Sequence, residues 1–191
     1  MWPYPDAMPS PSTRAGLLLV DLQPLTLGNA RTRPADELIA DLARLADAFR
    51  GAGLPVAHVV SLGMPDGATT YAETGRAWPE ELTVIAPDVA PQVGETVVRR
   101  FGLSAFAGTD LDAQLRAQGV STLVVAGIAT QFGVESTARD AYDRGFSVLV
   151  ASDGVAGPDP VAHESTLTRT VPVIGRITTI ADVIDGLVAD A

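Results

Sequence analysis

The stretch VSTLVVAGIATQFGVESTARDAYDRG, residues 120–145, joins two patterns that together decide the fold. Residues 120–129 form a continuous apolar run, which predicts a strand buried on both faces. Residues 134–145 read as a helix that stops at a glycine. Thr130, Gln131 and Phe132 make the crossing between the two, and Gly133 opens the helix. The stretch therefore predicts one strand–turn–helix unit.

The rest of the chain repeats this alternation. Further strands are expected at 15–23, 54–63, 95–101, 146–154 and 171–179. Further helices are expected at 35–53, at 106–119, after a start marked by Asp159 and Pro160, and at 180–190. Continuous apolar strands that alternate with helices form a mostly parallel sheet covered on both faces. We therefore expect a three-layer α/β/α fold with a six-stranded, mostly parallel sheet.

The composition limits the possible functions. The 191 residues are 47% hydrophobic and 19% charged, which suits a single domain over 15–191 behind a proline-rich arm, residues 1–14. The net charge of -10 argues against nucleic acid or a membrane surface as a partner. The absence of cysteine excludes disulfides and cysteine nucleophiles. The first 14 residues lack the features of a signal peptide, so a cytoplasmic protein is expected.

Two candidate functional residues follow predicted strands, because sites in parallel sheets form at the carboxyl ends of the strands. Asp21 follows an apolar run, where burial would raise its pKa and suit it to acid–base chemistry. Its alternative role is to cap a turn. Arg99 and Arg100 point to opposite faces of their strand, so only one of them can reach the site. The alternative for either arginine is a surface charge.

The turn from Ala129 to Gly133 is a third candidate. Free backbone N–H groups at the start of a helix attract an anion, although every strand–helix turn offers such groups. Asp153, near the end of another predicted strand, would lie at the same edge of the sheet. This convergence of strand ends is more informative than any one residue.

Three stretches of the chain resemble the isochorismatase-like hydrolase superfamily, which includes nicotinamidases, N-carbamoyl amidases and isochorismatases. They are LLLVDLQ (17–23), RRFGLSAFAGTDLDAQLRAQGVSTLVVAGIAT (99–130) and GVESTARDAYDRGFSVLVASDGVAG (133–157). The resemblance extends over roughly residues 15 to 180. It implies a Rossmann-like fold and, in the amidase branch, a catalytic triad of Asp, Lys and Cys.

The resemblance places the triad Asp on Asp21, the Lys on Arg100 and the Cys on Gly133. It also implies a cis peptide at Ile128–Ala129, with the N–H groups of Ala129 and Gly133 forming an oxyanion pocket. Metal-binding nicotinamidases carry an Asp and His residues after the first two strands. This chain has Gln23 after Asp21 and no His in the 62–82 loop, so neither a metal nor another cofactor is expected.

Since Gly133 has no thiol, cysteine-dependent amide hydrolysis is rejected. Ser136 is a poor replacement, because no His base is near it in the sequence. The favoured hypothesis is a cysteine-free hydrolase resembling isochorismatases, which also have Gly at this position and cleave a vinyl ether without a covalent intermediate. Asp21 would be the general acid, Arg100 would hold a substrate carboxylate, and Gly133 would leave room for a bulkier substrate.

The Arg at position 100 departs from isochorismatases, which resemble the amidases in using Lys, so the substrate need not be isochorismate. The second hypothesis is a non-catalytic family member that binds a small metabolite or serves as an assembly surface. The only expected partners are a small-molecule substrate and further copies of the chain, as a homodimer or higher oligomer. The expected substrate-binding residues are Gln23, Ile128, Ala129, Thr130, Gln131, Phe132, Arg76, Trp78 and Phe101.

Overall fold

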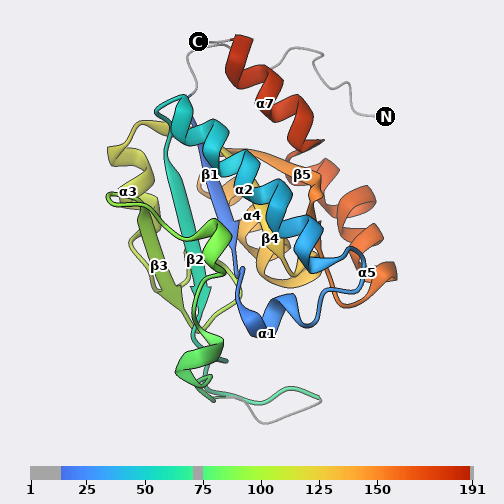
Figure 1. Ribbon diagram of the computed structural model, residues 1–191. Coiled ribbons are helices and arrows are strands. Elements are labelled where there is room, and N and C mark those ends of the chain that lie inside the picture. Colours follow the sequence, from blue (N-terminus) through green and yellow to red (C-terminus); the bar gives the residue numbers. More distant parts are fainter. Residues whose placement is uncertain (1–13, 71–74, 190–191) are drawn as a thin grey trace.

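The computed structural model describes residues 14–70 and 75–189, which build one six-stranded sheet between two layers of helices (Figure 1). The strand order is β3-β2-β1-β4-β5-β6, and every pair is parallel. The strands are β1 (Arg14–Val20), β2 (Val56–Ser61), β3 (Thr96–Arg100), β4 (Val120–Ile128), β5 (Ser147–Ala156) and β6 (Arg176–Thr178). The expected three-layer α/β fold is confirmed.

The helices are divided between the two faces of the sheet. They are α1 (Pro24–Leu27), α2 (Ala35–Gly51), α3 (Leu111–Ala117), α4 (Glu135–Asp143), α5 (Pro160–Ser165), α6 (Val171–Ile174) and α7 (Ile180–Ala189). Shorter helical turns are η1 (Glu80–Leu82), η2 (Pro87–Val89), η3 (Thr130–Val134) and η4 (Thr166–Thr170). In Figure 1, α2 and α7 lie in front of the sheet and α4 lies behind it. No helix in the described ranges is long and apolar enough to cross a membrane.

The central strand β1 shows why the sequence folds this way. Leu17 and Leu19 pack in the core under α2 and α7, while Leu18 and Val20 pack in the opposite core under α3, α4 and α6. Successive side chains of a strand point to opposite faces, so a strand buried on both faces needs an unbroken apolar run. The run ends at Val20, and the next residue, Asp21, leaves the sheet at its carboxyl edge.

Gly127, near the end of β4, allows β1 and β4 to approach closely. Its φ is 125°, and a Cβ atom there would overlap the carbonyl oxygen of Val20. Only glycine combines this backbone conformation with the space available. The close approach brings the end of β4 and the turn that follows it beside Asp21.

The two largest differences from the predicted elements concern one helix and one strand. The helix expected at 106–119 begins only at Leu111, because residues 101–110 form turns held by α4: Ser104 Oγ donates to Asp140 Oδ2 (2.7 Å) and Thr137 Oγ1 accepts from the Ala105 N–H (3.0 Å). The strand expected at 171–179 is wrong in its first half. Residues 171–174 are helical and continue the helical residues 160–170 without a break, and β6 covers only 176–178.

The predicted boundaries at the start of the chain also change. Arg14, assigned to the proline-rich arm, is the first residue of β1. Residues 1–13 of that arm lie outside the described residues.

The predicted start of α5 is confirmed, since Asp159 Oδ1 accepts from the N–H groups of Val161 (2.8 Å) and Ala162 (3.0 Å).

Candidate functional site

A buried ion pair joins the ends of β1 and β3. Arg100 Nη2 donates to Asp21 Oδ2 at 2.7 Å and to the carbonyl oxygen of Leu103 at 3.0 Å. Asp21 is 6% exposed and Arg100 is 4% exposed. Because β2 lies between β1 and β3, the Arg100 side chain crosses the end of β2 to reach the carboxylate. Arg99 is exposed, as expected if only one of the two arginines reaches the site.

The buried position changes the acidity of Asp21. Burial raises the pKa of this carboxyl to about 6, although the charge and hydrogen bond of Arg100 act in the opposite direction. A group with this pKa is present in both protonation states near pH 6, so it can donate a proton or accept one. Asp21 also has a φ of 52°, an uncommon conformation for a residue other than glycine.

The ion pair leaves two polar atoms unused. Among the atoms of the described residues, Asp21 Oδ1 and Arg100 Nε are buried and have no partner of good hydrogen-bond geometry. The backbone N–H of Ser61, which donates to Gln23 Oε1, still lies close enough to the Asp21 carboxyl to lower its pKa. Buried polar groups in proteins are nearly always paired, so an unpaired acceptor and an unpaired donor on neighbouring side chains indicate a place for a ligand or water. Arg100 Nη2 is already bonded, so Nε is the unpaired donor of this arginine.

Gly133 lies against this pair. A Cβ atom at position 133 would be 3.0 Å from Asp21 Oδ2, 3.1 Å from Val20 Cγ1 and 3.3 Å from Arg100 Nη2. The ion pair of this chain fills the space beside Gly133 on that side, so the room for a bulkier substrate expected there stays a prediction that this crowding does not favour. The glycine instead allows the wide Arg100 guanidinium to lie beside Asp21.

The turn after β4 has the backbone geometry that the resemblance implied. The Ile128–Ala129 peptide is cis. The carbonyl oxygen of Ala129 accepts from the N–H groups of Phe132 (3.0 Å) and Val134 (3.2 Å). These bonds hold η3 so that Gly133 faces Asp21.

A histidine absent from the sequence-based expectations supports this turn. The fully buried hydroxyl of Thr130 is 2.8 Å from His163 Nδ1 on α5, and burial lowers the pKa of His163. The side-chain oxygen of Gln131 is buried and, within the described ranges, has no partner. No sequence signal links Thr130 to His163, because they lie 33 positions apart with no recognisable spacing.

Gln23 is committed to the scaffold. Its Oε1 accepts from the Ser61 N–H (2.7 Å), and its Nε2 donates to the carbonyl oxygens of Ser61 (3.0 Å) and Leu82 (3.2 Å). The expected substrate contact is therefore replaced by a structural one, in which Gln23 ties the chain after β1 to the end of β2.

The remaining expected contacts come from the loop after β2, the turn after β3 and the turn after β4. Trp78 N–H donates to Leu62 O (2.8 Å), and the Leu62 N–H donates to Arg100 O (2.9 Å), so the 62–82 loop begins next to Arg100 and returns to its own first residue at Trp78. Arg76 is exposed and Trp78 is half-buried. Phe101 and Phe132 are both partly exposed, so neither side chain is buried inside the site.

Asp153 does not join the site. The strand β5 continues past it to Ala156, and Asp153 Oδ1 accepts from the Ile180 N–H (2.8 Å) at the start of α7.

Ser104 and Asp140, by contrast, were not expected to be functional residues. Their hydrogen bond anchors the turn in which the Leu103 carbonyl oxygen accepts from Arg100. Both lie in the family-like stretches SAF and ARDA, which was the available signal.

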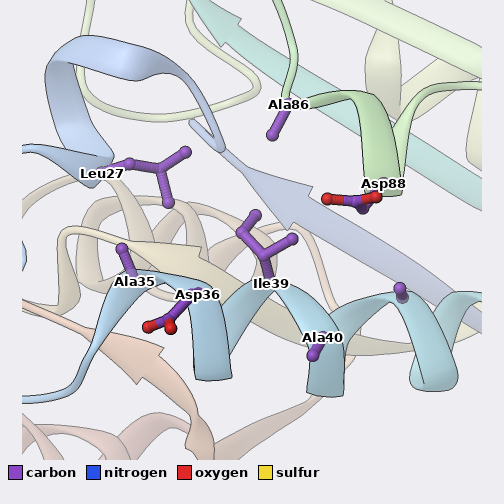
Figure 2. A pocket seen from close by; sticks show the side chains of 8 residues that line it. Leu27, Ala35, Asp36, Ile39, Ala40, Ala86 and Asp88 are labelled. Atoms are coloured by element: carbon purple, nitrogen blue, oxygen red, sulfur yellow. The ribbon is translucent and has the colours of Figure 1, made fainter.

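A separate groove of about 580 Å³ lies between α1, α2 and η2 (Figure 2). Aliphatic side chains such as Leu27 and Ile39 line it, together with Asp36 and Asp88. None of the expected site residues contributes to this groove. No cluster of three or more His, Cys, Asp or Glu side chains that could hold a metal occurs in the part of the chain that the structure describes.

Known proteins resemble this chain over most of its length. The isochorismatase domain profile matches residues 15–182. The uncharacterized isochorismatase family protein YecD of Escherichia coli O157:H7 is 32% identical over 188 residues, which cover 90% of this chain and 95% of that protein. Ureidoacrylate amidohydrolase RutB of Methylobacterium radiotolerans is 33% identical over 168 residues, covering 75% of this chain and 65% of that enzyme.

A solved structure gives the same answer for the fold. An isochorismatase family protein from Burkholderia thailandensis superimposes with a TM-score of 0.81 at 36% identity, covering 93% of this chain and 96% of that one. The chain belongs to the isochorismatase family and is a hydrolase of that family.

Proposed function

We propose that this hydrolase acts without a covalent intermediate, with Asp21 as the general acid and base. The observation that carries the proposal is the buried Asp21 carboxyl, which has a pKa of about 6. This carboxyl is paired with Arg100 and faces Gly133, which has no side chain. A carboxyl with such a pKa is a proton donor below pH 6 and a proton acceptor above it.

The reaction that suits this arrangement is cleavage of a vinyl-ether C–O bond in a small metabolite. Protonated Asp21 transfers its proton to the vinyl carbon, which leaves a carboxylate on Asp21 and an oxocarbenium ion on the substrate. Water adds to the cation and returns a proton to Asp21. The resulting hemiketal loses the alcohol and gives a carbonyl product, so the C–O bond breaks with no bond to the protein.

Arg100 supports both halves of this cycle. Its positive charge lowers the cost of the Asp21 carboxylate once the proton has left. Its unpaired Nε is available for an oxygen of a carboxylate-bearing substrate. The N–H groups of Ala129 and Gly133 would offer further donors from the turn.

A covalent route is disfavoured by the residues around the turn. Gly133 supplies no nucleophile, and in the described part of the chain no base hydrogen-bonds to Ser136, which lies on α4.

A non-catalytic binding role is the second candidate. It is favoured by the engagement of Asp21 Oδ2 with Arg100 and by the tight packing at Gly133, which together close one side of the carboxyl.

The test is a panel of small vinyl ethers and amides, with and without a carboxylate, assayed with the wild-type protein and with Asp21→Asn. We expect a vinyl ether to be hydrolysed and Asp21→Asn to reduce kcat by about 100-fold or more. Asp185→Asn, which removes an exposed carboxylate on α7, is the matched control and should retain full activity. Turnover that survives Asp21→Asn would refute the role of Asp21. Binding without any turnover would support the non-catalytic role.

Further parts of the proposal concern the whole molecule. We propose one domain over residues 15–191, a cytoplasmic location, and a homodimer or larger homo-oligomer. Sedimentation velocity of the full chain tests the last point, since a monomer at micromolar concentration would contradict it.

A further inference from the structure

Three exposed apolar residues lie on chain segments next to the buried ion pair. Phe101 is 44% exposed, Leu103 is 55% exposed and Phe132 is 50% exposed. We call these three residues the apolar rim. The other exposed large apolar residues of the described chain each come from a different element or loop.

The rim residues are held around Arg100 by contacts of their neighbours. Phe101 follows Arg100 in the chain, and the Leu103 carbonyl oxygen accepts from Arg100 Nη2 at 3.0 Å. Phe132 precedes Gly133, whose Cβ position is 3.3 Å from the same nitrogen. One guanidinium nitrogen therefore lies next to the chain segments that carry all three side chains.

In the part of the chain that the structure describes, the buried ion pair has one acceptor and one donor without a hydrogen-bond partner. Asp21 Oδ1 is a buried acceptor and Arg100 Nε a buried donor, and within the described residues neither is paired. A polar group that entered here would satisfy them, while an apolar group would leave their desolvation cost in place. Apolar surface exposed beside such a site commonly marks a ligand-binding surface.

We propose that the ligand of this site is amphipathic, with a polar end that reaches Asp21 Oδ1 and Arg100 Nε and an apolar body that packs on Phe101, Leu103 and Phe132. The inference rests on the proposed function for the identity of the site and adds the class of molecule that the site selects. A short, wholly polar metabolite would satisfy the ion pair and leave the rim in water.

The experiment measures binding rather than turnover, with homologous n-alkanoates from acetate to hexanoate and the matched n-alkanamides at pH 6. We expect the Kd to fall about two- to fourfold for each added methylene in both series, because each methylene that leaves water contributes a similar free energy. Phe132→Ala and Leu103→Ala should flatten this dependence on chain length while leaving the Kd of acetate within about twofold. Val93→Ala, an exposed apolar residue outside the rim, is the matched control.

A Kd independent of chain length would overturn the inference. So would a chain-length dependence that Phe132→Ala and Leu103→Ala do not alter. A change in the sedimentation coefficient of these variants, with unchanged Kd values, would assign the rim to contacts between copies of the chain. Chain-length-dependent binding without hydrolysis of any vinyl ether would keep this inference and refute the proposed chemistry. Hydrolysis without chain-length dependence would do the reverse.

Discussion

Gly133→Ala tests whether the Arg100–Asp21 pair fills the space beside this glycine. The new Cβ would lie 3.0 Å from Asp21 Oδ2, 3.1 Å from Val20 Cγ1 and 3.3 Å from Arg100 Nη2, closer than ordinary van der Waals contact in all three cases. These neighbours are buried and cannot move into solvent. Overpacking of this kind typically costs about 1–3 kcal/mol of unfolding free energy.

The same reasoning predicts coupling between positions 133 and 100. Arg100→Lys replaces the guanidinium by a narrower ammonium and removes the Nη2 atom that lies near the new Cβ. In a double-mutant cycle we therefore expect Gly133→Ala to cost about 1 kcal/mol less in the Arg100→Lys background than in the wild type. Urea unfolding followed by circular dichroism measures all four proteins.

The matched control is Gly186→Ala on the helix α7, where a Cβ atom would meet nothing within 4 Å. This substitution should stabilise the protein by about 0.5–1 kcal/mol, since alanine is the better helix former. If Gly133→Ala were as harmless as Gly186→Ala, the packing argument would be refuted. Equal costs in the wild-type and Arg100→Lys backgrounds would refute the coupling even if the site were crowded.

Two further predictions concern protons and the turn. Because the folded pKa of Asp21, about 6, is above its ordinary value of 3.8, the protonated form favours the folded state. Its contribution to the unfolding free energy, about 3 kcal/mol, should be present below pH 3.8 and disappear as the pH rises through 6. The measurement is the difference in unfolding free energy between wild type and Asp21→Asn in urea melts at pH 4–7. His163→Leu should destabilise the protein by about 1–2 kcal/mol by leaving the buried Thr130 hydroxyl unpaired, whereas His163→Asn, whose amide can replace Nδ1, should cost less; equal losses in thermal melts would contradict that hydrogen bond.

The parts of the fold that could be predicted from sequence depend on local pattern. The apolar runs of β1 and β4 indicated buried parallel strands because both of their faces need apolar side chains. The segment 171–179 misled because VPVIGRIT has strand-like composition, while its first residues pack as a helix against α4 and the edge of the sheet. Composition in so short a segment cannot distinguish a buried helix from a strand.

The site, too, could be predicted from sequence only in part. Asp21 could be selected because it ends an apolar strand. The strand pattern left Arg99 and Arg100 open, and the family resemblance selected Arg100, whose side chain the structure places in contact with Asp21. The Thr130–His163 bond, the bonds of Gln23 and the role of Asp153 at α7 could not be foreseen, because each depends on the relative placement of segments far apart in the chain. The tight fit at Gly133 is likewise a property of three packed segments.

Because Arg100 crosses β2 to reach Asp21, the ion pair forms only when β1, β2 and β3 pair in the correct register. Leu19 is paired with His58 across β1 and β2, and Ser61 is paired with Arg100 across β2 and β3. A slip of one residue at either boundary would shift the guanidinium by about 3.3 Å and turn it to the opposite face of the sheet. A misaligned sheet could still bury apolar side chains, yet it would hold no paired Asp21. The proton transfer proposed for this carboxyl therefore requires all three strands to be paired in the correct register.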